Sequence, residues 1–197
     1  MLACTRWLTE MGHEKKWLGE NMKIDLPSEA EWEKAARGGE EIFQPPRIIS
    51  LDKIMTEHYT IEPRMKNEKP QRRYPWSDDA DPNRANYAET KIGATNAVGC
   101  FPDGASPCGC EEMSGNVWEW TRSLWGKDYA KPDFKYPYEL KDDRENLEAP
   151  RDILRVIRGG SFGTNASGVR CAFRDWHRPN FRDRYYGFRL SARPLSF

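Results

Sequence analysis

Apolar residues recur at helical spacing near the start of the chain. In residues 1–18, Leu2, Trp7, Leu8 and Met11 fall toward one side of a helical wheel. Apolar positions three to four residues apart are typical of an amphipathic helix with one buried face. The pattern therefore predicts a helix over 1–18 whose tryptophan and leucines face the protein interior.

A second helix is predicted to begin at Ser28. Ser28 is followed three residues later by Glu31, which is the spacing of a capping box. The helix is expected to end at Gly38, because glycine accepts the left-handed conformation that closes a helix. The residues expected on its buried face are Trp32, Ala35 and Ala36.

Strand-like segments lie in the second half of the chain and are separated by loops. Residues 113–124 and 153–161 are predicted strands, and residues 74–110 and 129–150 are predicted loops. A closing strand is expected at 188–193, where apolar and polar residues alternate. The residues expected on its buried side are Phe188, Leu190 and Ala192, and those on its exposed side are Arg189, Ser191 and Arg193.

Composition favours one loop-rich domain with an aromatic core. The 197 residues include 15 Gly and 14 Pro, and Trp, Tyr and Phe number 8 each. Lys plus Arg and Asp plus Glu both number 31, so no overall charge points to a nucleic acid or a membrane surface. Without an apolar run of membrane-spanning length or a signal peptide, we expect a cytoplasmic protein, or one exported by a route that the sequence does not show.

Four motifs occur in a fixed order along the chain. They are LPSEAEWEKAARGG at 26–39, YPW with ANY at 74–87, MSGNVWEW at 113–120, and a frame of Arg, Gly, Pro and Phe residues at 158–190. Together they resemble the formylglycine-generating-enzyme (sulfatase-modifying factor) domain family. The resemblance implies an α+β fold, a variant of the C-type lectin fold that is rich in loops and has two helices and short antiparallel strands.

The resemblance extends from about residue 2 to residue 194 and leaves two parts of the domain unexplained. We expect residues 1–197 to form a single domain that is truncated at its N-terminus relative to the family, which a partner chain or an oligomer would complete. Residues 40–73 have no counterpart in the family and form a predicted insert, with a short helix at 50–58. The insert is interpreted as a solvated excursion or, alternatively, as a contact for a partner.

Catalysis of the family type is not expected. The resemblance implies that the enzymes oxidise a substrate cysteine with a cysteine pair, whose positions here are Gly163 and Gly168. Glycine has no thiolate, so we expect no copper at these positions. Cys171 matches a family cysteine outside that pair, and it is either a buried structural residue or a thiol with a pKa lowered by Arg170 and Arg174.

Calcium is the metal that the resemblance implies, held by loop oxygens. For Glu119, the alternative is an ion pair with a core arginine such as Arg158 or Arg170. Two sets of ligands follow from the matching positions. The first is Glu112, the carbonyls of Gly115 and Val117, and Glu119; the weaker second is Asn86, the carbonyls of Tyr87 and Ile92, and Thr90.

The C-terminal segment has an unusual composition. From Arg151 onward there is no Lys, Glu, Gln or Met. This gap is expected if adenines of Asn codons are randomised, as in the variable protein of a diversity-generating retroelement, which the segment resembles. Trp176 lies outside the reachable set of residues and is expected to be constant. The alternative is a family domain whose ligand loops drifted.

The diversified surface is expected at about 162–187. Its aromatic rings supply rigid contact area and its arginines supply forked donors, as in an antibody paratope. We therefore predict a non-catalytic domain that binds a protein or another macromolecule; an enzyme or accessory acting without the cysteine pair, and a structural or signalling module, are the alternatives. The predicted ligand-binding residues are Asn165, Ser167, Asp175, Trp176, His177, Arg178, Asn180, Phe181, Asp183, Arg184, Tyr185 and Tyr186.

Overall fold

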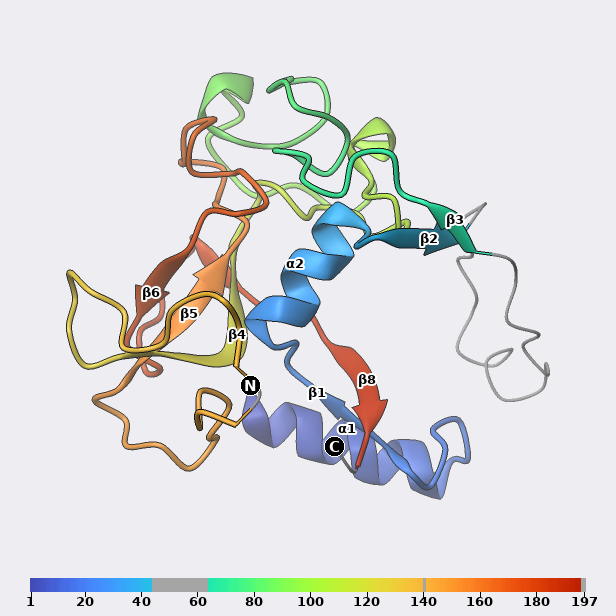
Figure 1. Ribbon diagram of the computed structural model, residues 1–197, viewed down its shortest axis with the longest axis vertical. Helices are drawn as coiled ribbons and strands as arrows, with labels where there is room; N and C mark the ends of the chain where they lie inside the picture. Colours follow the sequence, from blue (N-terminus) through green and yellow to red (C-terminus); the bar gives the residue numbers. More distant parts are fainter. Residues whose placement is uncertain (44–63, 140, 196–197) are drawn as a thin grey trace.

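The computed structural model describes residues 1–43, 64–139 and 141–195. Helix α1 (Leu2–Glu14) lies at one end of the molecule beside strand β1, and helix α2 (Glu29–Arg37) lies near its centre (Figure 1). Long loops, two of them containing the short 3-10 turns η1 (Ala88–Thr90) and η2 (Pro102–Gly104), form the opposite end. The predicted helix at 50–58 lies outside the described residues.

Helix α1 differs from its prediction in length and in its buried face. It ends at Glu14, because the backbone turns at Lys16 with φ 59° and the N–H of Leu18 returns to the carbonyl of Gly12. Thr5 and Gly12 are its buried residues, whereas Trp7 is 58% exposed. The prediction that Trp7 faces the interior was therefore wrong: α1 meets β1 through Thr9 and His13, whose side chains bond the backbone of Ile24 and Met22.

Helix α2 confirms its prediction. The Ser28 hydroxyl accepts the Glu31 backbone N–H at 3.1 Å, and the Glu31 carboxylate accepts the Ser28 N–H at 2.8 Å. Gly38 closes the helix with φ 88°. Trp32 and Ala36 are fully buried, and they pack against Met113 and Cys171 from distant parts of the chain.

A four-stranded sheet in the order β6-β5-β4-β7 forms the centre of the fold (Figure 1). Every residue of its inner strands is buried, so both faces of the sheet are covered. Strand β7 joins β4 in parallel, whereas the other described pairs are antiparallel as expected. The strands are β4 (Trp118–Gly126), β5 (Leu154–Arg158), β6 (Asp175–His177) and β7 (Tyr186–Gly187).

Two smaller sheets complete the structure. Strand β1 (Met22–Asp25) pairs with β8 (Ser191–Pro194), which brings the beginning and the end of the described chain together. Strands β2 (Glu41–Phe43) and β3 (Arg64–Lys66) form an antiparallel pair at the two ends of the undescribed segment 44–63. Both strands lie within the predicted insert, 40–73.

In the closing strand, the buried and exposed sides are the reverse of the prediction. Phe188 and Leu190 are 42% and 39% exposed, whereas Arg189 and Arg193 point inward. The reason is ionic, because Arg189 pairs with Glu119 at 2.5 Å and Arg193 pairs with Asp25 at 2.8 Å. Buried carboxylates on other strands decide which side of this segment faces the interior.

A buried ion network joins α2 to the central sheet. Arg158 on β5 and Glu29 at the start of α2 are both fully buried and are 3.1 Å apart. Arg174 also contacts Glu29, at 2.5 Å, and Arg158 reaches Glu33 at 2.7 Å. The Arg158 guanidinium additionally donates to the carbonyl of Cys171. One carboxylate and its two arginines therefore hold together three segments that are far apart in sequence.

Replacing Glu29 with alanine is expected to destabilise the protein strongly. Removing one partner of a buried ion pair leaves a desolvated charge and costs about 3–5 kcal/mol. Chemical denaturation of Glu29→Ala measures the change in unfolding free energy, and the exposed Glu20→Ala is the matched control, with an expected change of about 0.5 kcal/mol or less. Equal losses in the two variants would contradict the structural role of Glu29.

Candidate ligand-binding surface

The two edge strands of the central sheet carry several of the predicted ligand-binding residues. From opposite edges, the rings of His177 on β6 and Tyr186 on β7 reach toward one another, with centroids 5.5 Å apart. Phe181 stacks on His177 at 3.7 Å and meets Tyr186 edge-on at 5.3 Å. We call these three rings the ring cluster. Trp120 of β4 supports it, 6.2 Å from Tyr186.

Asp175 lies beside the ring cluster without a cationic partner. Its carboxylate accepts the N–H of Trp176 at 2.8 Å, and no arginine or lysine pairs with it in the described part of the chain. Burial raises the pKa of Asp175, with the Trp176 N–H and the charge of His177 acting in the opposite direction. Other buried carboxylates, such as Asp25 and Glu29, do have arginine partners. Asp175 therefore offers an uncompensated negative charge at the surface.

The neighbours of Asp175 are also affected by burial. Burial lowers the pKa of His177 below its ordinary value of 6.5, helped by Arg178 and opposed by Asp175. Burial also raises the pKa of Tyr186, with Asp175 and Asp183 adding to the effect. Burial thus opposes a charge on both His177 and Tyr186, so the ring cluster favours its uncharged form.

A second group of predicted residues lies on the Gly163 side of β7. Tyr185 stacks on Phe162 with centroids 4.7 Å apart, and the Arg184 guanidinium lies over both rings. A Cβ atom on Gly163 would come within 3.1 Å of the Tyr185 ring. The adjacent residues Tyr185 and Tyr186 thus have different neighbours, as expected for successive residues of an extended segment.

The remaining predicted residues are placed around these two groups. Trp176 packs against Trp125 and meets Tyr129 edge-on at 4.8 Å, and Arg178 donates to the Tyr129 hydroxyl at 2.9 Å. Asn165 and Ser167 bond each other at 2.7 Å in an exposed turn, whereas Asn180 and Asp183 are exposed in the segment that joins β6 to β7.

Sequence reasoning missed the residues that support this surface. Phe162 lies under Tyr185, Trp120 under Tyr186, and Tyr129 beside Trp176 and Arg178. Trp120 belongs to the MSGNVWEW motif, but nothing local shows which surface residues Trp120 and Phe162 touch. Tyr129 comes from a loop that was predicted as a mere connection.

Gly168, one of the two positions of the family cysteine pair, has no room for a side chain, whereas a side chain at Gly163 would only be tight against Tyr185. A Cβ atom on Gly168 would come within 2.4 Å of the Thr164 methyl group. Burial raises the pKa of the neighbouring Cys171 to about 12, although Arg37 and Arg158 lower it somewhat. The alternative in which Arg170 and Arg174 lower this pKa was therefore wrong. Cys171 is a buried thiol, which agrees with a structural role.

In the first predicted calcium set, the Glu119 carboxylate already has hydrogen-bond partners within the protein. Both Glu119 oxygens bond Arg189, and one of them also accepts the Trp32 indole N–H at 2.6 Å. The expected ion pair of Glu119 thus exists, but with Arg189 and not with Arg158 or Arg170. Gly115 lies against the carbonyl of Asn86, where a Cβ atom would be only 2.1 Å away. A cation at Glu119 would meet the positive charge of Arg189.

The second set is also partly used inside the protein. The Thr90 hydroxyl donates to the carbonyl of Ala85 at 2.7 Å and accepts the Tyr87 N–H at 3.2 Å. The Ile92 side chain is 48% exposed. Groups of three or more His, Cys, Asp or Glu residues at metal-binding distance do not occur in the described residues. Within this second set, a cation would therefore find amide and carbonyl oxygens but no free hydroxyl or carboxylate.

Two buried oxygens, one from each predicted set, lack hydrogen-bond partners. They are Oδ1 of Asn86 and Oε2 of Glu112. Asn96 bridges the two residues, since its Oδ1 accepts from Asn86 at 2.6 Å and its Nδ2 donates to Glu112 at 3.4 Å. Burial raises the pKa of Glu112, an effect that a bound cation would reverse. These two residues fit a hard cation better than either complete set.

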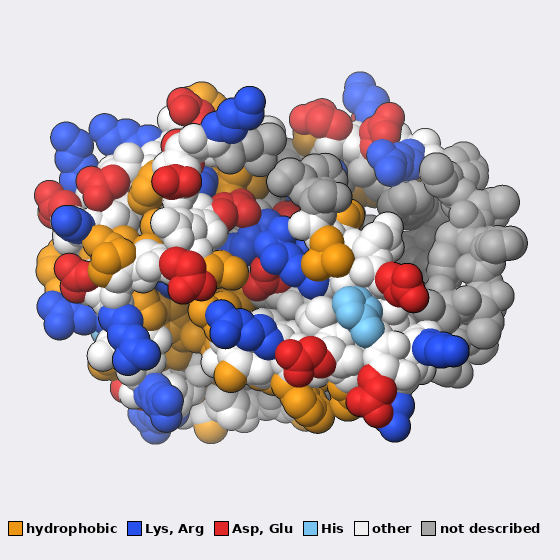
Figure 2. All heavy atoms as spheres, turned by 90° about the horizontal axis from the view of Figure 1, so that it is seen from below, with side chains coloured by type: hydrophobic (Ala, Val, Ile, Leu, Met, Phe, Trp, Pro, Cys, Tyr) orange, Lys and Arg blue, Asp and Glu red, His pale blue; other side chains and the backbone are white. Residues whose placement is uncertain are grey.

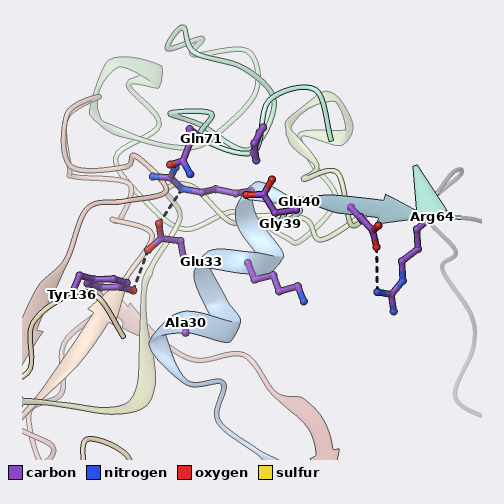
Figure 3. Close-up of a pocket in the computed structure, with 11 residues that line it drawn as sticks. Ala30, Glu33, Gly39, Glu40, Arg64, Gln71 and Tyr136 are labelled. Carbon is purple, nitrogen blue, oxygen red and sulfur yellow. Dashed lines mark hydrogen bonds and ion pairs between the residues drawn. The ribbon is translucent and has the colours of Figure 1, made fainter. Parts of the chain in front are cut away.

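A cavity of about 510 Å³ lies beside α2, away from the predicted surface (Figure 3). Its central carboxylate is Glu33, which accepts from the Tyr136 hydroxyl at 3.3 Å and pairs with Arg37 and Arg158. None of its lining residues belongs to the predicted ligand-binding set. Because its central carboxylate already has partners, this cavity offers little uncompensated chemistry.

The charge distribution agrees with the balanced composition. Figure 2 shows one face of the molecule, on which acidic and basic side chains are interspersed with hydrophobic ones. Among the described helices, none combines the length and the apolar character that crossing a membrane requires.

Comparison with known proteins gives a family match over residues 3–194, to the sulfatase-modifying factor enzyme 1-like domain. The chain is 29% identical to the serine/threonine-protein kinase pkn1 of Chlamydia pneumoniae over 94% of its own length and 23% of the kinase. It is 35% identical to hercynine oxygenase of Mycolicibacterium thermoresistibile over 61% of its length and 26% of that enzyme. The chain thus spans about a quarter of these relatives.

A solved structure supports the fold. Treponema denticola variable protein 1 superimposes with a TM-score of 0.53 and 22% sequence identity, over 86% of this chain and 47% of that one. At this identity the likeness shows that the two proteins share the fold.

Replacing Asp175 with asparagine is expected to raise the melting temperature at neutral pH. The pKa of Asp175 is raised in the folded protein, so its ionised form costs stability once the pH exceeds that raised value. Below the ordinary value of 3.8 the carboxyl is protonated in both states, and the advantage of asparagine should disappear. Thermal melts of Asp175→Asn across this range measure the effect. The exposed Asp183→Asn is the control, and a lower melting temperature of Asp175→Asn at neutral pH would contradict the argument.

Proposed function

Because this chain belongs to the sulfatase-modifying factor enzyme 1-like domain family, we propose that it is a non-catalytic ligand-binding domain with a diversified C-terminal surface. The diversified surface comprises about residues 162–187. The ligand is a protein or another macromolecule, and sequence diversity arises through a diversity-generating retroelement. The scaffold is the loop-rich variant of the C-type lectin fold.

The observation that carries the proposal is that three arginines of the frame and the two arginines of the predicted variable set have different partners. Arg158, Arg174 and Arg189 belong to the constant frame, and each pairs with a buried glutamate. The other frame arginines, Arg170 and Arg182, form no ion pair with a described residue. Arg178 and Arg184 belong to the predicted variable set, and they contact the surface rings of Tyr129 and Tyr185 without pairing with a carboxylate in the described chain. Variation at the second kind of position leaves the ion network intact.

The chemistry of the surface suits recognition of a macromolecule. The ring cluster supplies aromatic area with few rotatable bonds, and Asp175 supplies a charge that has no partner within the protein. A carboxylate that lowers stability at neutral pH is consistent with a residue retained for binding. A basic group on the ligand would compensate its charge.

An enzymatic alternative has less support. Hercynine oxygenase and the kinase pkn1 are relatives over only part of their length, so their activities do not carry over to this chain. Sulfur oxidation of the family type needs two thiols, whereas this chain has Gly163 and Gly168 at those positions and a protonated Cys171 beside them. Binding therefore accounts for more of the observed residues than catalysis does.

Two matched libraries test the proposal. In the first, His177, Phe181, Asp183 and Arg184 are replaced by residues that adenine randomisation allows; in the second, Arg158, Arg174 and Arg189 are replaced. Changes at the first set are expected to shift stability by about 0.5 kcal/mol or less each, because these residues lie outside the ion network. Soluble yield and melting temperature should therefore be retained in the first library and lost in the second.

Binding selections with the first library complete the test. Display of the variants against a panel of unrelated proteins should yield binders whose specificity follows the substituted positions. Unfolding at equal frequency in both libraries would show that the predicted variable residues serve packing, and would refute the proposal.

We also propose one calcium ion held by Glu112 and Asn86, in place of two ions held by the full predicted sets. The support is the pair of buried oxygens without partners, which Asn96 bridges. A bound calcium would supply positive charge that ties the 86–96 loop to the segment before β4. Glu119 and Thr90 are left out of this proposal because their oxygens already have partners.

Calcium is expected to raise the melting temperature relative to chelator. A ligand that binds only the folded state stabilises it by about 2.7 kcal/mol at a hundred times its Kd. Glu112→Gln should abolish the response, because it removes the charged ligand, whereas Glu111→Gln removes the same charge next to it and should respond normally. A calcium response that survives Glu112→Gln would exclude this site.

A further inference from the structure

A cavity lined by arginines lies beside the proposed variable surface. Its volume is about 330 Å³, and its arginines come from β4, from β5 and the turn before it, and from the segment between β6 and β7. Trp120, Leu26 and Leu2 form an apolar wall, and no acidic side chain lines the cavity. The arginines are Arg122, Arg151, Arg155 and Arg182.

Within the described parts of the chain, one of these arginines has carboxylate partners. Arg122 pairs with Glu31 and Glu145, both at 2.7 Å. Arg155 is only 8% exposed, yet its guanidinium donates to backbone carbonyls alone, including that of Arg122 at 2.6 Å. Burial lowers the pKa of Arg155, and no neighbouring carboxylate counteracts the effect.

Arg151 and Arg182 are exposed at the cavity, and neither forms an ion pair with another described residue. The cavity therefore holds more positive charge than the surrounding protein compensates. This contrasts with the ion network of α2, where each arginine faces a glutamate. An anion inside the cavity would give Arg155 the counter-charge that the chain does not provide.

We propose that this cavity binds an oxyanion, a carboxylate or a phosphate, carried on an apolar body. Guanidinium groups match both oxyanions through paired N–H donors, and such charge-assisted bonds are stronger where water is partly excluded. The Trp120 and Leu26 wall would accommodate the apolar part. Asn180 is the single lining residue that belongs to the predicted variable set, so the site would be largely shared by all variants of the surface.

Calorimetric titration with N-acetylphenylalanine tests the site, and its neutral amide is the matched ligand control. The acid is expected to bind and the amide to give no measurable heat of binding. Titration with phenyl phosphate then distinguishes a phosphate from a carboxylate as the preferred group. Binding of either anion supports the proposal, whereas equal binding of acid and amide, or no binding of both anions, overturns it.

Charge-neutral variants locate the bound anion. Arg151→Gln and Arg182→Gln should each weaken binding about tenfold, because each loses a charge-assisted hydrogen bond. Both residues are exposed, so the variants should keep the melting temperature of the original protein. Arg6→Gln is the control, since Arg6 is exposed, lies outside the cavity and faces Glu148.

One further variant separates this site from the proposed variable surface. Arg184→Ser changes the variable set without touching the cavity, and it should leave anion binding unchanged even if it alters macromolecular binding. Equal weakening by Arg6→Gln and Arg151→Gln would show a general charge effect and would overturn the cavity as the site.

Discussion

The fold depends on the buried carboxylate of Glu29. It lies in the first turn of α2 and accepts from Arg158 of β5 and from Arg174 of the C-terminal segment. A buried charge without partners would cost several kcal/mol, so the three residues are stable only together. This requirement fixes α2 on the sheet and fixes the start of β6 beside it. A chain with so much loop and so little aliphatic core therefore relies on paired charges to define its geometry.

The same principle recurs at the end of the chain. Arg189 reaches Glu119 on β4, and Arg193 reaches Asp25 on β1. These pairs turn the polar side of the closing segment inward and leave Phe188 and Leu190 exposed. The short strands β6 and β7 at the sheet edges take no part in these two pairs, and their residues stay half-buried. Their rings and Asp175 then form a surface whose members are largely separate from the ion network.

Relative to its family, the chain keeps the scaffold and has glycine at both positions expected to carry the cysteine pair. The glycines at 163 and 168 leave space that Tyr185 and Thr164 occupy, and Cys171 stays protonated in the interior. The candidate surface is aromatic and amphipathic. Asp175 on this surface, and Arg151 and Arg182 in the cavity beside it, pair with no described residue of opposite charge. Negative and positive charges without partners in the described chain thus lie near one another. This arrangement favours a binding role for this face of the protein.

The sequence by itself determined the features that depend on neighbouring residues. The capping box at Ser28, the left-handed Gly38, the burial of Trp32 and the family scaffold all follow from local patterns or ordered motifs. The members of the candidate surface were also identified from composition and spacing, although their role stays a prediction. Local chemistry was sufficient because caps and strand motifs involve residues within a few positions of one another.

Only the tertiary structure decided which charges meet. Glu119 and Arg189 are 70 positions apart, and Glu29 and Arg174 are 145 apart, so no spacing rule pairs them. For the same reason, local patterns could not show that Asp175 lacks a charged partner among the described residues, that Trp7 is exposed, or that the buried and exposed sides of 188–193 are reversed. Burial of a charge is set by every element packed around it, and that arrangement exists only in the folded chain.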